Sequence, residues 1–107
     1  MSEHKRKAYR QGDVLLIEVE TLPDDENLEP KDNILAYGEI TGHHHRFQAD
    51  EFVHTWVNRQ GQQYVTLFAP SILYHEEHES FEVAPGDYRV VIQQELDLTH
   101  ASRYVVG

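Results

Sequence analysis

The 107-residue sequence contains no cysteine, and this absence narrows its chemistry. Disulfide bonds, thiolate zinc sites and thiol nucleophiles all require that side chain, so all three are excluded together. Any metal ion would have to be held by nitrogen and oxygen atoms. A metal centre must therefore be sought among the 8 histidines and 19 acidic residues.

Long hydrophobic runs are also missing. No window approaches the roughly 20 apolar residues that a membrane-spanning helix needs. The first residues, "MSEHKRKAYRQGD", lack the apolar core of a signal peptide. We therefore expect a cytoplasmic protein with no membrane partner.

Positive charge is scarce. The 9 lysines and arginines against 19 acidic residues give a formal net charge of −10. An acidic surface repels phosphate backbones, which disfavours nucleic acid as the main partner. The one basic run, residues 4–7, is expected to be solvated within a flexible tail over residues 1–8. Residues 9–107 are predicted to form a single β domain with one core.

No segment has the pattern of an amphipathic helix. Short runs in which apolar and polar residues alternate recur instead. After the Gly12-Asp13 turn signal, the sequence "VLLIEV" places Leu15, Ile17 and Val19 on one face of a strand. "EFVHTWV" and "QQYVTLFA", joined by "NRQG", are typical of a hairpin. About seven such strands with frequent turns predict an all-β fold, either a small antiparallel β-barrel or a sandwich.

Other segments carry weaker signals. "PDDENLEPKDN" is predicted to be an exposed loop. The last residues, "DLTHASRYVVG", fit either a short helical turn or a final strand. His54, between Phe52 and Trp56 on one strand face, is expected to pack within or beside the core. Five aromatic residues are predicted to fill the core by pairing across strands: Trp56, Tyr64, Phe68, Phe81 and Tyr88.

Most of the histidines gather in two segments, "ITGHHHRF" at 40–47 and "LYHEEHESF" at 73–81. On an extended strand His43 and His45 share one face, and His44 and Arg46 point the other way. The second segment adds His75 and His78, with Glu77 on the His75 face. Barrel curvature can bring two such strands together at one mouth.

This pattern predicts a divalent metal site with three or four ligands. They are His43, His45, His75, and His78 or Glu77. Zinc, nickel, manganese and iron all accept nitrogen and oxygen ligands of this kind. If the protein is an enzyme, open metal positions would suit hydrolysis, isomerisation or oxygen chemistry on a small molecule, with Glu77 or Glu79 carrying protons.

The alternative is a non-catalytic interaction or assembly module. In that interpretation the histidines lie on exposed turns, or they sense pH through their charge. Short strands leave sheet edges that favour pairing between copies, so a homodimer is expected in either case.

Four segments, "RQGDVLL", "ILAYGEITGHHHRF", "HEEH" and "GDYRVVIQQE", resemble a family of short uncharacterised proteins from bacteria and phages. The resemblance spans about residues 10–95. It implies that His43, His45, His75 and His78 belong to a recurrent pattern, and it implies no activity. A second similarity is to cupins, β-barrels with a His-x-His-then-Glu motif. Here Glu51 lies one or two positions later than in that motif, and the second cupin motif is absent.

Overall fold

The computed structural model describes residues 6–24, 27–38 and 42–93, and these residues contain ten β-strands and no helix. The all-β prediction is confirmed. The strands are β1 (Ala8–Gln11), β2 (Val14–Val19), β3 (Glu29–Lys31), β4 (Ile34–Tyr37), β5 (His44–Phe47), β6 (Val53–Val57), β7 (Gln63–Leu67), β8 (Ser71–Tyr74), β9 (Phe81–Val83) and β10 (Gly86–Ile92).

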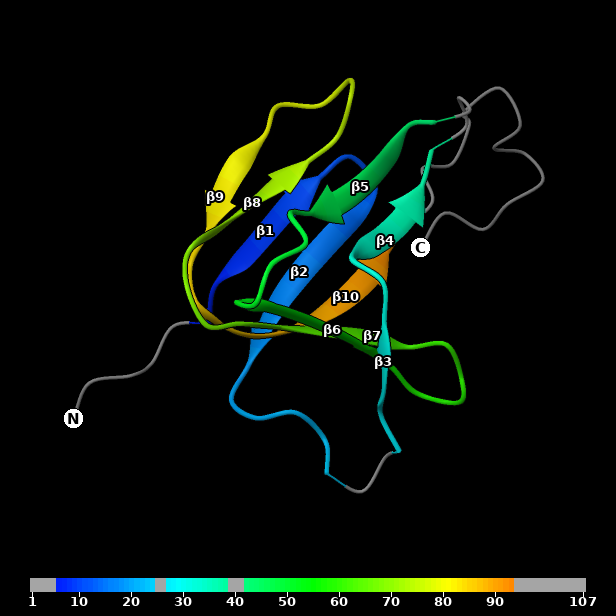
Figure 1. The fold of residues 1–107 in the computed structure, drawn as a ribbon, viewed down its shortest axis with the longest axis vertical. Helices are drawn as coiled ribbons and strands as arrows, with labels where there is room; N and C mark the ends of the chain where they lie inside the picture. The colour runs from blue at the N-terminus through cyan, green and yellow to red at the C-terminus, as the bar shows by residue number, and fades with distance from the viewer. Residues whose placement is uncertain (1–5, 25–26, 39–41, 94–107) are drawn as a thin grey trace, which may run out of the picture.

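The strands form two sheets in which every pair is antiparallel. The six-stranded sheet has the order β1-β2-β10-β7-β6-β3, and the four-stranded sheet has the order β4-β5-β8-β9 (Figure 1). The predicted hairpin is present as β6 and β7, with Trp56 opposite Tyr64. Because the chain alternates between the sheets, short segments far apart in sequence become neighbours.

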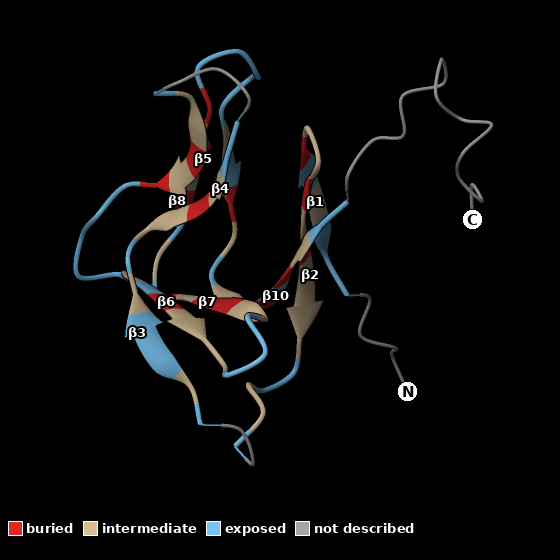
Figure 2. Ribbon diagram, turned by 90° about the vertical axis from the view of Figure 1, so that its right-hand side faces the viewer, coloured by how far each residue is buried: buried red, intermediate tan, exposed pale blue. Residues whose placement is uncertain are grey.

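Neither sheet closes into a barrel among the described residues. Figure 2 shows the six-stranded sheet bending from β1 and β2, which face the four-stranded sheet, toward β7, β6 and β3 below it. Of the two predicted architectures, the sandwich therefore fits. The prediction of about seven strands missed several short ones. One of them is β3, which lies inside the segment predicted to be an exposed acidic loop. Its Pro30 cannot donate to a ladder, and β3 sits accordingly at a sheet edge.

The core lies between the sheets and is almost entirely apolar. On β2 the alternation is present, and the face that enters the core carries Val14 and Leu16, while Leu15 and Ile17 are half-buried on the other face. The core cluster comprises Val14, Leu16, Leu35, Phe47, Val65, Leu67, Leu73, Val83, Tyr88 and Val90. Burying these side chains supplies the main driving force for joining the sheets.

The predicted burial of two side chains, Phe68 and His54, was wrong. Tyr64 and Tyr88 are buried, but Phe68 is 65% exposed because it alternates with the buried Leu67 and so points outward. His54 is likewise exposed, and it contacts the rings of Trp56 and Phe68 on the outer surface rather than packing in the core.

The predicted chain ends fall partly outside the described residues. Strand β1 begins at Ala8, the last residue of the predicted tail, and the backbone of Lys7 before it is hydrogen-bonded to Glu18. Residues 94–107, for which a helical turn or a final strand was predicted, lie outside the described part of the chain, and His100 lies there too.

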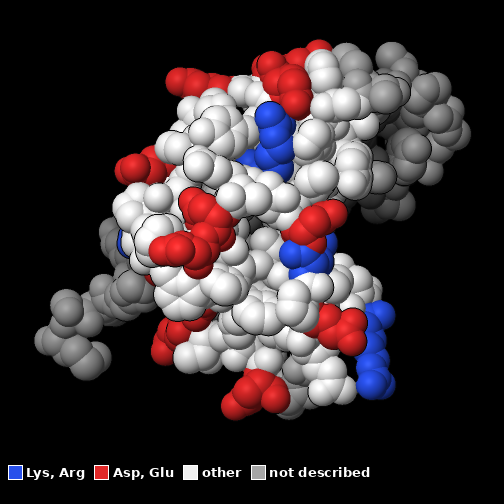
Figure 3. Space-filling model, in the orientation of Figure 1, with Lys and Arg blue, Asp and Glu red and all other residues white. Residues whose placement is uncertain are grey.

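The surface carries far more acidic than basic groups. Figure 3 shows carboxylates spread over the face in view, with only a few lysine and arginine side chains among them. In the described part of the chain, no helix has the length and apolar character that crossing a membrane would require.

Candidate metal centre

His45 reaches the interior through the alternation of β5. In this strand His45 and Phe47 point inward, while His44 and Arg46 are only half-buried. The His45 side chain is 3% exposed, which is unusual for an imidazole and requires its nitrogen atoms to find partners.

His75 and His78 follow β8, in the loop that leads to β9. Strand β8 pairs with β5 so that Arg46 faces Tyr74. One residue further along this antiparallel register, the chain brings His75 next to His45. His75 is buried at 8% exposure, and His78 lies in the exposed part of the loop.

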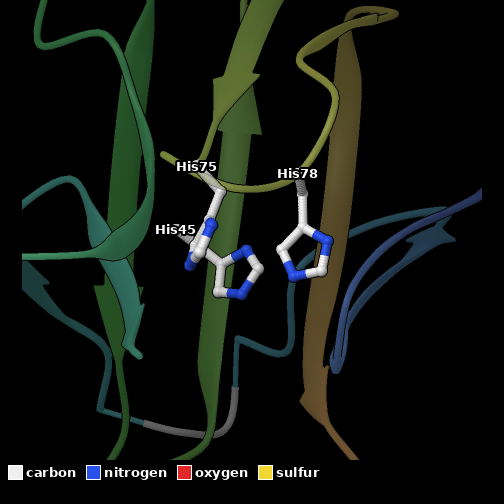
Figure 4. Close-up of side chains that lie close together, drawn as sticks. All are labelled: His45, His75 and His78. Carbon is white, nitrogen blue, oxygen red and sulfur yellow. The ribbon is translucent and has the colours of Figure 1, made fainter. Parts of the chain in front are cut away.

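The three imidazoles gather at one point. Each offers a nitrogen atom, and these atoms lie within 4.8 Å of one another. The ring centroids are 4.3 Å apart for His45 and His75, 4.7 Å for His75 and His78, and 5.6 Å for His45 and His78 (Figure 4). Imidazoles bound through nitrogen to one tetrahedral zinc ion would have centroids roughly 5 Å apart.

Gln11 at the end of β1 determines which nitrogen of His45 carries the proton. Its side-chain N–H groups donate to the carbonyls of Leu73 and Glu79, both at 3.0 Å. Its Oε1 is therefore left as an acceptor, 2.8 Å from His45 Nδ1. His45 must donate from Nδ1, so its Nε2 holds a lone pair when the ring is neutral. This arrangement is typical of histidines that bind metals through Nε2.

His45 is neutral near pH 7. Its pKa is lowered to about 4, chiefly by burial and also by the neighbouring His75, while Asp13 opposes the decrease. Asp13 Oδ1 lies 3.3 Å from His45 Nε2, but with a neutral ring this contact is not an ion pair. The Nε2 lone pair of His45 and the carboxylate oxygen of Asp13 then face each other at a distance that suits two ligands of one cation.

His75 has the opposite arrangement. Its Nδ1 accepts a hydrogen bond from the Glu77 backbone N–H at 3.0 Å, so the neutral ring carries its proton on Nε2. Burial lowers the pKa of His75, and His78 lowers it further. To bind a metal through Nδ1, His75 would have to exchange the Glu77 amide for the ion.

His43, the fourth predicted histidine ligand, is not in the group of three. It precedes β5, and its ring meets the His75 ring edge-on with centroids 6.0 Å apart. Its Nδ1 is buried without a hydrogen-bond partner among the described residues, and Glu77 Oε2 lies 3.7 Å away. Strand β8 ends at Tyr74, so Glu77 reaches His43 from the loop rather than from a strand face.

An ion pair holds the histidine-bearing loop against β5. Glu76 accepts hydrogen bonds from the His44 backbone N–H at 2.9 Å and from Arg46 at 3.0 Å. These contacts also lower the pKa of Glu76, chiefly through the His44 amide. The loop that carries His75 and His78 is thereby fixed at its start.

The sequence did not indicate that the β1–β2 turn belongs to the site. Gly12 and Asp13 were interpreted only as a turn signal before a strand, and Gln11 was given no role, yet all three lie against the histidine cluster. They are more than thirty positions from His45. Glu51, the residue suggested by the cupin similarity, lies in the turn before β6, where its carbonyl accepts from His54.

Comparison with known families gives one match. A family described as a domain of unknown function (DUF8820) matches residues 10–93, and the chain belongs to this family. The match covers nearly the same residues as the resemblance noted from the sequence. No curated protein and no solved structure matches the chain.

Proposed function

We propose that this member of the DUF8820 family binds one divalent transition-metal ion through His45, His75 and His78. The observation that carries the proposal is the convergence of three imidazole nitrogens within 4.8 Å in the described part of the chain. Two of these rings, His45 and His75, are buried.

The state of His45 supports the same proposal. A lowered pKa keeps the ring neutral, and neutral imidazole is the form that binds metals. Because Gln11 Oε1 accepts the proton of His45 Nδ1, the free lone pair of His45 is on Nε2. Binding therefore needs neither deprotonation of His45 near neutral pH nor rotation of its ring.

Zinc is the first metal to test. Imidazole suits zinc, copper, iron and nickel, whereas magnesium and calcium prefer all-oxygen sites. The sequence contains no thiolate donor. Metal-assisted chemistry on a small molecule would require a coordination position left open to solvent, in addition to the three histidines.

The test is metal binding by protein without an affinity tag. We expect one Zn²⁺ per chain by calorimetry and elemental analysis. Replacing His78 by alanine should weaken zinc binding by about 100-fold or more, because a direct ligand is lost and even outer-shell partners contribute about 10–100-fold. The matched control is His44→Ala, which removes the neighbouring imidazole that contacts Tyr37 and Gly42 instead of the cluster. Substoichiometric zinc in the wild type, or equal weakening in both variants, would refute the proposal.

A second candidate is an acid-sensing module, and the close spacing of the buried His45 and His75 rings, with centroids 4.3 Å apart, favours it. Protonating buried neighbouring imidazoles would force their rings apart and loosen the loop after β8. This function predicts a melting temperature that falls with acid and does not change on adding zinc or a chelator. Stabilisation by zinc that the chelator reverses would favour the metal site instead.

A further inference from the structure

The turn between β1 and β2 lies against the histidine cluster although it belongs to the other sheet. Figure 1 shows this turn beside β8 and β5. Three consecutive residues make separate contacts there: Gln11 with His45, Gly12 with His78, and Asp13 with His45. The three histidines all come from the four-stranded sheet and its loop. The cluster is therefore completed by a segment from the six-stranded sheet.

Asp13 is not in the group whose ligand atoms all lie within 4.8 Å of one another, but it contacts one member of that group, His45. Its Oδ1 is 3.3 Å from His45 Nε2, the nitrogen that Gln11 leaves unprotonated. Two ligand atoms that are each about 2.0–2.1 Å from a tetrahedral zinc ion lie about 3.3–3.4 Å apart. The observed separation equals one edge of such a tetrahedron. Without a proton or a cation between them, these two acceptor atoms would repel each other.

Gly12 permits this close approach. A Cβ atom at Gly12 would lie 2.7 Å from His78 Nε2 and 3.2 Å from His45 Cε1. The residue also has φ of +60°, which glycine adopts without strain. The turn backbone thus packs close against His78 and His45, where a side chain at position 12 would clash.

We propose that Asp13 is the fourth ligand of the metal site, giving a set of three nitrogen atoms and one carboxylate oxygen. This inference rests on the proposed metal binding by His45, His75 and His78. The bound ion would connect the β1–β2 turn to β5 and to the loop after β8. Four protein ligands close a tetrahedral zinc site, so the ion would hold the two sheets together as a structural centre.

The test compares Asp13→Asn with Asp24→Asn. Both variants remove one negative charge, and Asp24 lies in the loop at the far end of β2. Each variant is first shown to fold without metal by circular dichroism. Zn²⁺ affinity is then measured by competition with a chromophoric chelator, and Co²⁺ is used as a spectroscopic probe of coordination.

We expect Asp13→Asn to weaken Zn²⁺ binding by about 100-fold relative to Asp24→Asn, the upper end of the loss known for supporting residues. The intense visible bands of four-coordinate Co²⁺ should also weaken or shift in Asp13→Asn alone. The proposed function stands if the wild type and His44→Ala bind zinc and His78→Ala binds it much more weakly. In that case this inference still fails if Asp13→Asn has the same zinc affinity and cobalt spectrum as Asp24→Asn. If the wild type does not bind zinc, both fail.

Discussion

Acid should destabilise the metal-free protein through His45. The unfolded chain takes up a proton on this histidine near the ordinary pKa of 6.5, whereas the folded chain does so only near about 4. Between these values the unfolded state binds more protons, so stability falls as the pH falls. The contribution of His45 is complete above about pH 6.5 and is lost progressively as the pH decreases to about 4.

The size of the effect follows from the two pKa values. Their separation of about 2.5 units corresponds to about 3 kcal/mol when the loss is complete. At about pH 5 roughly 2 kcal/mol should already be lost through His45. His75 acts in the same direction, because its pKa is also lowered.

Urea unfolding in the presence of a chelator, at several pH values between about 7.5 and 5, measures this loss. Fluorescence of the single tryptophan, Trp56, reports unfolding. His45→Gln should flatten the pH dependence by about 2 kcal/mol, whereas His54→Gln, which removes an exposed histidine, should leave the wild-type slope. Parallel curves for the wild type and His45→Gln would show that burial does not hold the ring neutral.

Two further substitutions test the β1–β2 turn. Gly12→Ala should cost about 1–2 kcal/mol because of its positive φ and should weaken zinc binding at least about 10-fold by displacing His78. Gly61→Ala is its control, since Gly61 has φ of +87° but open space around a Cβ, and equal zinc affinity in the two variants would contradict the contact. Gln11→Leu should lower the free energy of unfolding by about 2–4 kcal/mol, since the buried carbonyl of Leu73 and the Nδ1–H of His45 lose their partner. Urea denaturation at about pH 7.5 measures this loss, and a change below about 0.5 kcal/mol would show that Gln11 does not organise the cluster.

Local patterns determined much of the fold. Alternation in "VLLIEV", "VHTWV" and "QQYVTLFA" predicted β2, β6 and β7, because a period of two separates a core face from a solvent face. The same patterns could not indicate that the chain alternates between two open sheets. That arrangement depends on which strands pair, and pairing is decided by long-range packing.

The short edge strand β3 shows the limit of local propensity. Its sequence, Glu-Pro-Lys, has the composition of a loop, and it is extended only because β6 offers a hydrogen-bonding edge. Phe68 shows the same limit for burial. Its apolar ring predicted a core position, but it follows Leu67, the buried last residue of β7, and points the opposite way, outward.

For the candidate site, the sequence by itself determined the imidazoles: their number, their two segments, and the exclusion of thiolate ligands. Tertiary structure alone decided that His45 joins His75 and His78 while His43 stays outside, since the β5–β8 register aligns His45 with the end of β8. It also brought Gln11, Gly12 and Asp13 to the cluster from the other sheet. A turn between two strands has no local signal for what it will face, because that contact forms only when the sheets pack.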